Sequence, residues 1–283
     1  MSGPSAAAPV PPVVDAAWLE RRRAEGGAVL ADVRWYLDGR SGRAAYAGGH
    51  LPGAVFVDLE RWLSGQGSDA AGRHPLPDPA VFAEGMGALG IGDDDVVVAY
   101  DDAGGVIAAR LVWMLRATGH PAALLDGGLL AWRGPLEQEA PQRPPQHFSP
   151  RPWPAGSLAD VEDATDRRLA VLDARPRERY RGDADPVDPR SGHIPGARSL
   201  PCRENLAADG TLLPVEELRR RLAEVGVTEG TEVVSSCGSG VTACHTLLVL
   251  EHTGLGPGRL FPGSWSQYSR DGGRPVATGD EPG

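Results

Sequence analysis

The strongest constraint on the fold of this chain is an internal repeat of about 140 residues. The run V-L-A-D-V-R that ends at Arg34 returns as A-V-L-D-A-R ending at Arg175. The turn sequence G-H-L-P-G-A that begins at Gly49 returns as G-H-I-P-G-A beginning at Gly192. A repeat of this length is much longer than a solenoid unit, so it predicts two homologous domains.

The repeat and the local composition suggest where these domains begin and end. We expect a disordered tail over residues 1–12, a first domain over 13–134, a linker over 135–156 and a second domain over 157–283. The tail is rich in alanine and proline, and the linker is rich in proline and glutamine, which is typical of a semi-rigid connection rather than a core. A length of 283 residues fits two domains of ordinary size.

Each half alternates short β-branched runs with amphipathic segments, and a glycine-containing turn joins them. This order predicts an α/β fold of two open, mainly parallel sheets flanked by helices. Ligands of such sheets bind beyond the carboxyl ends of the strands, here near residues 101–105 and 237–242. The predicted strands are 29–33, 95–100, 122–125, 170–174, 231–236 and 259–261, and the predicted helices are 106–118 and 241–252.

The charge pattern excludes several classes of function. A net charge of −10 argues against a nucleic-acid partner, which would need a basic face. The chain contains no lysine, so Schiff-base chemistry and P-loop phosphate binding are excluded, and any anionic substrate must be held by arginine, histidine or backbone amides. No apolar run reaches the roughly 20 residues of a membrane span, and the N-terminus lacks a secretion signal, so we expect no membrane association and a cytoplasmic location.

Of the three cysteines, Cys237 stands out by its surroundings. The cysteines are odd in number and form no C-x-x-C pair, which favours a free thiol over a disulfide framework or a zinc site. Cys237 follows a predicted buried strand and precedes Gly-Ser-Gly and a helix, whereas Cys244 lies inside that helix and Cys202 has no comparable cradle. We therefore interpret Cys202 and Cys244 as structural.

The loop after Cys237 is suited to an anionic sulfur. Gly238 and Gly240 let the backbone curl with its amides pointing inward, and the helix N-terminus adds about half a positive charge. Both effects favour a thiolate over a thiol, and the same cradle can hold a persulfide. A buried, inert cysteine is the other interpretation, but the glycines and the strand-to-helix position favour a nucleophile. A phosphatase would need an arginine at position 243, which is alanine here.

Taken together, D-V-R and D-A-R, G-H-[IL]-P-G-A, C-G-S-G-V-T-A and the D-G-G/F-P-G turn resemble the tandem rhodanese-domain sulfurtransferases, over about residues 13–275. The resemblance implies a catalytically silent first domain, with Asp101 in the position that Cys237 occupies 136 residues later. The loop C-G-S-G-V-T is similar to that of 3-mercaptopyruvate sulfurtransferases. Members that use thiosulfate tend to carry charged residues there, and thiosulfate stays open as the alternative donor.

The resemblance also implies how the donor is bound. Arg179, before Tyr180, and Arg190, before S-G-H, match the two arginines expected to hold the carboxylate and the keto oxygen. Guanidinium pairs with carboxylate in a bidentate geometry, which is the physical reason for arginine at these positions. The segment that carries them is about two residues longer than is usual in the family. The amides expected to hold the sulfur are those of Gly238, Gly240, Val241 and Thr242.

A proton relay across the two domains is a further implication of the family pattern. Asp58, His74 and Ser239 match positions that would pass a proton between the donor thiol and the departing pyruvate enolate. In contrast, His50 and His193 occur in both copies of the repeat, so we interpret them as turn-stabilising hydrogen bonders rather than catalysts.

The predicted reaction is therefore sulfur transfer from 3-mercaptopyruvate through a Cys237 persulfide to a thiol acceptor, such as a thioredoxin-like protein, or to cyanide. The resemblance implies no metal and no organic cofactor. Two alternatives remain at this point: a thiosulfate:cyanide sulfurtransferase, and a non-catalytic binding module of the same fold. The intact Cys237 loop speaks against the second alternative.

Overall fold

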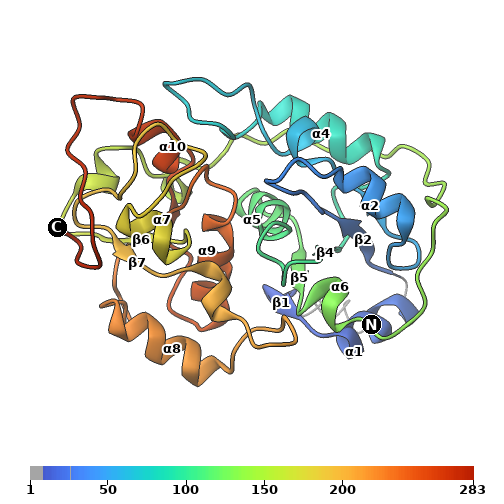
Figure 1. Ribbon diagram of the computed structural model, residues 1–283. Coiled ribbons are helices and arrows are strands. Elements are labelled where there is room, and N and C mark those ends of the chain that lie inside the picture. The colour runs from blue at the N-terminus through green and yellow to red at the C-terminus, as the bar shows by residue number, and fades with distance from the viewer. Residues whose placement is uncertain (1–8, 26) are drawn as a thin grey trace, which may run out of the picture.

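The computed structural model describes residues 9–25 and 27–283, so residues 1–8 of the expected tail lie outside the described residues. Two α/β units lie side by side, the first blue to green and the second yellow to red in Figure 1. The first unit contains a five-stranded sheet in the order β1-β5-β4-β2-β3, and the second a four-stranded sheet in the order β7-β6-β8-β9. All pairs between these strands are parallel, which confirms the fold class predicted from the sequence.

The strands are β1 (Val13–Val14), β2 (Val29–Asp32), β3 (Val55–Phe56), β4 (Val97–Tyr100), β5 (Ala122–Leu125), β6 (Ala170–Asp173), β7 (Arg198–Ser199), β8 (Val233–Ser236) and β9 (Arg259–Leu260). The α-helices are α1 (Ala16–Ala24), α2 (Gly42–Gly48), α3 (Leu59–Trp62), α4 (Pro79–Ala88), α5 (Ala109–Ala117), α6 (Gly128–Ala131), α7 (Arg177–Arg181), α8 (Val215–Glu224), α9 (Ala243–His252) and α10 (Ser264–Tyr268). Short 3-10 helices lie at Ala155–Ser157, Asp163–Thr165 and Cys202–Asn205.

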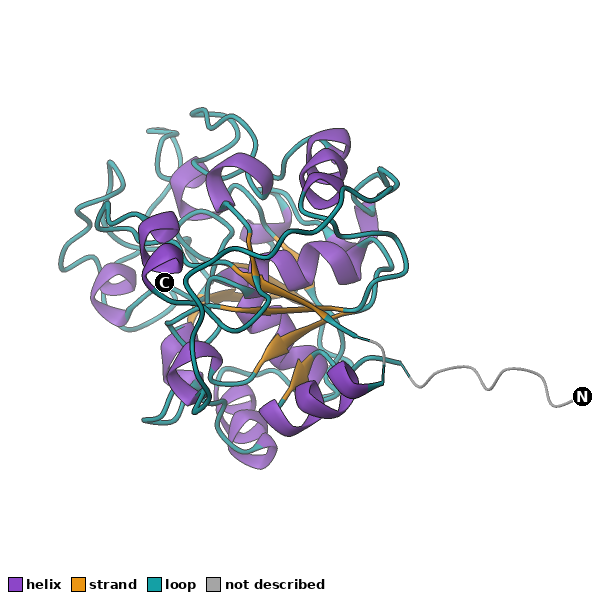
Figure 2. Ribbon diagram, turned by 90° about the vertical axis from the view of Figure 1, so that its right-hand side faces the viewer, coloured by secondary structure: helices purple, strands orange, loops and turns teal. Residues whose placement is uncertain are grey.

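The central strands are buried because helices lie on both sides of the sheets (Figure 2). All four residues of β4 are buried, and so are all four of β8, which explains why their sequences are continuous β-branched or small-residue runs rather than alternating ones. The predicted strands therefore fall close to the observed ones. The helix predicted over 106–118 begins later, at Ala109, because the amides of Ile107 and Ala108 donate to the Asp101 carboxylate instead of joining the helix.

The repeated D-x-R motif ties each sheet to its G-H-x-P-G-A turn. Arg34 forms a bidentate pair with Asp32 at the end of β2 and donates to the carbonyl of Gly49 at 2.8 Å. The second domain repeats this arrangement with Asp173, Arg175 and Gly192. Because both copies keep it, the motif serves the fold rather than the reaction.

The repeated histidines have the turn-stabilising role expected of them. His50 stacks on Tyr46 with ring centroids 3.8 Å apart, and its Nδ1 lies 2.9 Å from the Tyr46 carbonyl. His193 stacks on Tyr180 at 3.7 Å, and its Nδ1 lies 2.8 Å from the Tyr180 carbonyl.

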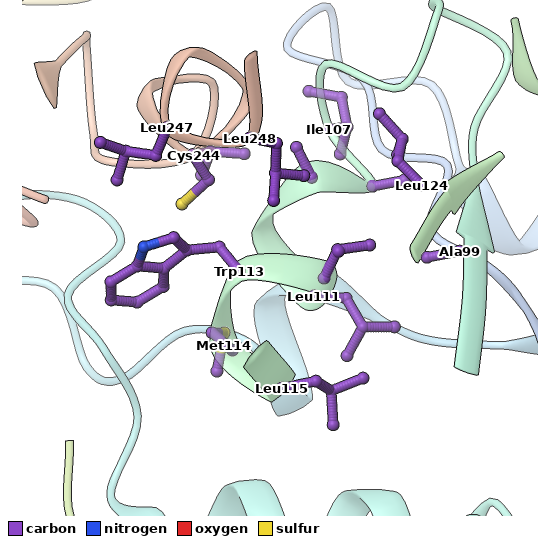
Figure 3. Packing of buried hydrophobic residues seen from close by; sticks show 14 of the residues in the cluster. Ala99, Ile107, Leu111, Trp113, Met114, Leu115, Leu124, Cys244, Leu247 and Leu248 are labelled. Atoms are coloured by element: carbon purple, nitrogen blue, oxygen red, sulfur yellow. The ribbon is translucent and has the colours of Figure 1, made fainter. Parts of the chain in front are cut away.

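The two domains share one continuous hydrophobic core across the seam between α5 and α9. Figure 3 shows Trp113 and Leu111 of α5 on one side of the seam and Cys244 and Leu248 of α9 on the other. The segment over 135–156 packs on the first domain, where Trp153 donates its indole N–H to the carbonyl of Pro77 at 2.8 Å. Within residues 9–25 and 27–283, no helix has both the length and the apolar character that would let it cross a bilayer.

We predict that Leu248→Ala lowers the free energy of unfolding by about 2–5 kcal/mol, because Leu248 is 2% exposed and its loss leaves a cavity in the shared core. Urea denaturation followed by tryptophan fluorescence measures the change. Leu130→Ala is the matched control, since Leu130 is 49% exposed and its loss should change stability by no more than about 0.5 kcal/mol. Equal changes in the free energy of unfolding for the two substitutions would contradict the packing of Leu248 in the core that the two domains share.

Candidate active site

Cys237 lies directly after β8, where its backbone and side chain are held from three directions. Its Sγ accepts a hydrogen bond from the amide of Gly240 at 3.1 Å, and the residue is only 2% exposed. Its own amide donates to Ser264 Oγ at 3.0 Å, and its carbonyl accepts from the amide of Trp265 at 3.0 Å. Val241 and Thr242 lie in the turn before α9, which begins at Ala243 rather than at the predicted Val241. The loop therefore presents a fixed sulfur beside the amide of Gly240.

The equivalent loop of the first domain shows what such a cradle holds. The Asp101 carboxylate is fully buried and accepts four backbone hydrogen bonds of 2.7–2.9 Å. Burial raises the pKa of Asp101, and the four amide donors act in the opposite direction. Because all four partners are donors, the site accommodates an acceptor-only anion. The donors are the amides of Ala103, Gly105, Ile107 and Ala108.

This comparison bears on the chemistry of Cys237. The outer sulfur of a cysteine persulfide is three bonds from Cα, as a carboxylate oxygen of aspartate is. An anion at that distance from the chain is what the Asp101 loop already binds through backbone amides alone. The Cys237 loop also runs from a strand into a helix, and the amide of Gly240 donates to its sulfur, so we expect this loop to suit a persulfide anion.

Ser239 and His74 meet across the domain boundary. His74 Nδ1 lies 2.8 Å from Ser239 Oγ, and His74 Nε2 lies 3.1 Å from Glu60 Oε1. A carboxylate can only accept, so the Nε2–H donates to Glu60, and Nδ1 is free to accept the Ser239 hydroxyl proton. Burial lowers the pKa of His74, Glu60 raises it, and the nearby Arg110 and Arg73 lower it further. The imidazole is thus neutral at pH 7 and can act as a base.

The carboxylate that contacts His74 is that of Glu60 and not that of Asp58, which differs from the arrangement predicted from the sequence. Asp58 is the N-cap of α3, and its Oδ1 accepts the amides of Glu60 at 3.1 Å and Arg61 at 3.2 Å. This capping role directs its carboxylate to the helix backbone. Glu60, in the first turn of α3, also accepts the indole N–H of Trp35 at 2.9 Å, which fixes the carboxylate that contacts His74.

Two arginines from different domains converge on Gly238. A Cβ at Gly238 would lie 3.2 Å from Arg73 Nη2 and 3.3 Å from Arg179 Nη1, so only glycine leaves ordinary contact distances here. The Asp188 carboxylate accepts from Arg73 through Oδ1 and from Arg179 through Oδ2, and it is buried. The Nε atoms of both arginines are buried and have no hydrogen-bond partner among the residues that the structure describes. Arg179 Nη2 also donates to both carboxylate oxygens of Asp185 at 3.0 Å. The Nη atoms, rather than the buried Nε atoms, are the donors that face Gly238.

Arg190 does not join them, contrary to the sequence prediction. Its guanidinium donates to backbone carbonyls at the end of α10 and in the segment that follows this helix, at 2.6–3.1 Å. The acceptors are Tyr268, Ser269, Asp271 and Arg274. Arg190 is thus a structural residue that fixes the segment after α10. Arg73 takes the place beside Arg179, and no motif signalled it because it stands in the other domain.

Arg110 of α5 was also missed from the sequence. It is fully buried, and its Nη1 donates to the carbonyl of Gly240 at 2.9 Å. Its Nη2 donates to the carbonyl of His74 at 3.1 Å, and Nε and Nη2 both lie 3.3 Å from the carbonyl of Leu63. Within the described part of the chain it forms no salt bridge. Burial lowers the pKa of Arg110, while the carbonyls that it contacts and the nearby side chains of Cys244 and Cys237 favour its charged form.

The other two cysteines are structural, as expected. Both are buried, and burial raises the pKa of Cys202 and of Cys244 to about 12. Cys244 Sγ donates weakly to the Gly240 carbonyl at 3.4 Å. Neither thiol is in a state that attacks a substrate at neutral pH.

Comparison with known proteins agrees with this geometry. The rhodanese-like domain model matches residues 15–134 and 157–271. A probable 3-mercaptopyruvate sulfurtransferase of Pseudomonas aeruginosa is 42% identical, covering 93% of this chain and 96% of its own. A Mycobacterium tuberculosis protein provisionally named as a thiosulfate sulfurtransferase is 43% identical, covering 88% and 90%. The crystal structure of SseA from Escherichia coli, a 3-mercaptopyruvate sulfotransferase, matches with a TM-score of 0.79 and 32% identity, covering 91% of this chain and all of SseA.

The chain therefore belongs to the rhodanese-like family and carries two copies of its domain. The relatives that it matches along nearly their whole length are sulfurtransferases, and this chain is an enzyme of that class.

We predict an acid limb in the pH profile of kcat/KM that reflects protonation of His74. Burial holds the His74 pKa below 6.5, so the neutral base is present above that pH and is lost as the pH falls through the lowered pKa. Glu60→Gln removes a contribution that raises this pKa, so the limb should move to lower pH. Asp58→Asn is the control and should leave the limb in place. A limb that moves with Asp58→Asn but not with Glu60→Gln would contradict this assignment.

Proposed function

We propose that this enzyme transfers sulfane sulfur from 3-mercaptopyruvate to a thiol acceptor through a persulfide on Cys237. In this proposal residues 157–283 form the catalytic domain, and residues 13–134 form a silent domain that completes the site. The observation that carries the choice of donor is the Ser239–His74–Glu60 chain beside Cys237. When 3-mercaptopyruvate gives up its sulfur, pyruvate leaves as an enolate that must be protonated. When thiosulfate gives up its sulfur, sulfite leaves and needs no proton.

In the first half-reaction the Cys237 thiolate attacks the sulfur of the donor. A new S–S bond forms, the C–S bond breaks, and its electron pair stays on carbon as the pyruvate enolate. The thiol proton of the donor is lost from sulfur, and one proton is gained by the enolate carbon, so that pyruvate and an anionic persulfide result. No external acid or oxidant is needed for this balance.

Ser239 and His74 are proposed to move that proton. As the donor thiol transfers its proton to Ser239 Oγ, the serine proton passes to His74 Nδ1, 2.8 Å away, and Glu60 stabilises the resulting imidazolium. The reverse transfer then protonates the enolate carbon. The amides of Gly240, Val241 and Thr242 are proposed to hold the anionic persulfide. Of their counterparts in the first domain, Gly105 donates its amide to the Asp101 carboxylate at 2.7 Å.

The donor carboxylate is proposed to bind between Arg73 and Arg179. The two guanidinium groups face the same side of Gly238, and their buried Nε donors lack protein partners among the described residues. Asp188 contacts both arginines and Asp185 also contacts Arg179, so carboxylates hold the pair in place. The Nη atoms nearest Gly238 are the donors proposed to reach the substrate carboxylate. Charge-assisted hydrogen bonds to a carboxylate are the interaction that this arrangement favours.

In the second half-reaction a thiolate, or cyanide in an assay, attacks the outer sulfur and restores the Cys237 thiolate. We propose a thioredoxin-like protein or a small thiol as acceptor, in a cytoplasmic setting. The three free cysteines are compatible with a reducing compartment.

Mass spectrometry of the intact protein tests the persulfide and the donor together. Mixing with 3-mercaptopyruvate should add one sulfur atom, and Cys237→Ser should add none. A gain with thiosulfate but not with mercaptopyruvate would replace the proposed donor, and no gain with either would remove the proposed activity while leaving the family assignment intact.

Steady-state kinetics test the proposed carboxylate clamp. Arg73→Gln and Arg179→Gln should each raise KM for mercaptopyruvate about 10- to 100-fold, the loss expected for a hydrogen bond between charged groups. Arg190→Gln should destabilise the fold but leave KM near the wild-type value, because its donors serve backbone carbonyls. A large rise in KM for Arg190→Gln, with little change for Arg73→Gln and Arg179→Gln, would instead assign the binding of the donor carboxylate to Arg190.

A further inference from the structure

Ser264, the first residue of α10, has a backbone conformation that its side chain disfavours. Its φ is 50°, and among the residues that the structure describes no other non-glycine residue has a positive φ. A Cβ in this left-handed region meets the backbone, so the conformation persists only where the surroundings enforce it. Such outliers gather at functional sites, and this one lies against Cys237.

The duplication supplies a direct comparison, because Gly128 stands 136 residues earlier in the same turn. Gly128 has a φ of 49° and begins α6 as Ser264 begins α10. The following amide, that of Leu129, donates to the Asp101 carbonyl at 2.9 Å, just as Trp265 donates to the Cys237 carbonyl at 3.0 Å. The turn and its backbone hydrogen bond are therefore built without strain by glycine, so the fold alone does not require a serine.

Compared with the Gly128 turn of the first domain, the Ser264 turn of the second domain has an additional hydroxyl group. Ser264 Oγ accepts the amide of Cys237 at 3.0 Å and donates to the carbonyl of Phe261 at 2.8 Å, and the residue is fully buried. Together with the Trp265 amide on the carbonyl, this hydrogen bond engages both backbone groups of Cys237. The direction of the Cys237 Cα–Cβ bond, and with it the position of Sγ beside the Gly240 amide, is then fixed.

We infer that Ser264 is a positioning residue for Cys237, retained for the reaction in spite of its strained backbone. Attack on a sulfur requires the thiolate to stand in line with the bond that breaks, and the same atom must return to its place after each transfer. A hydrogen bond from the Cys237 amide to a rigid hydroxyl supplies that restraint. Where it concerns the reacting step, this inference rests on the proposed function.

The test compares Ser264→Gly with Ser264→Ala. Both remove the hydroxyl, but only glycine relieves the strained φ. We expect the rate of persulfide formation to fall about 10-fold in both variants, as expected for one lost hydrogen bond. The melting temperature should be higher for the glycine variant than for the alanine variant by about 2–4 °C. A wild-type rate in Ser264→Gly, or rates that follow the melting temperatures, would overturn the inference.

Gly128→Ala is the matched control in the first domain. It places a Cβ at the same φ, 2.4 Å from the Asp101 carbonyl oxygen, and should lower the melting temperature while leaving the rate per folded molecule unchanged. A loss of rate as large as that of Ser264→Ala would show that strain in the turn, rather than the hydroxyl, governs the reaction, and would overturn the inference.

Alkylation of Cys237 by iodoacetamide separates this inference from the proposed function, because it needs no sulfur donor. Both Ser264 variants should alkylate at a changed rate relative to the wild type, with Cys237→Ser as the blank. If the wild type takes sulfur from neither donor, the proposed function fails, but the alkylation comparison still tests the positioning role. Wild-type alkylation rates in both variants would overturn that role alone.

Discussion

The site depends on the hydrogen bonds that the buried guanidinium of Arg110 donates to backbone carbonyls of both domains. Arg110 donates to the carbonyls of Leu63 and His74 in the first domain and to that of Gly240 in the cysteine loop. Burial of a charge is costly, and the cost is offset here because several carbonyl dipoles point at one cation and because the side chains of Cys244 and Cys237 lie nearby. Removing any of these segments would leave the charge unsatisfied, so α5, the segment before His74 and the cysteine loop are energetically coupled.

This coupling explains how a proton relay is assembled from two domains. Arg110 contacts the backbone of His74 itself and of Gly240, the residue after Ser239. Because one rigid guanidinium fixes both backbones, the side chains of His74 and Ser239 meet at 2.8 Å. The continuous core between α5 and α9 then keeps Arg110 in place. The first domain is thus part of the site, since it provides His74, the Glu60 carboxylate that contacts it and the Arg110 cation behind the loop.

The sequence predicted those parts of the molecule that depend on local pattern. The buried strands, the loop after Cys237 and the two-domain organisation follow from periodicity, glycine placement and the repeat, and Ser239, His74 and Arg179 fall beside the cysteine loop as the family pattern implied. Arg73 and Arg110 could not be predicted in this way, because each reaches the site across the domain boundary, where no spacing rule relates the residues. The choice between Asp58 and Glu60 depended on which carboxylate caps α3, and sequence alone does not separate two acidic residues on either side of one leucine.

A comparison of the Asp101 loop with the Cys237 loop also indicates why the charged and polar groups of the site gather around one loop and not around both. A strand-to-helix loop with inward amides needs an anion at its centre, and Asp101 satisfies that need permanently in the first domain. The second domain places the Cys237 sulfur at this point, where it accepts the amide of Gly240, and Ser264 and Trp265 restrain the backbone of the cysteine. Because Asp101 occupies the loop of the first domain, His74, Arg73 and Arg110 of that domain instead contact the loop of the second domain. The surroundings of Cys237 therefore depend on both domains, even though the cysteine stands in one of them.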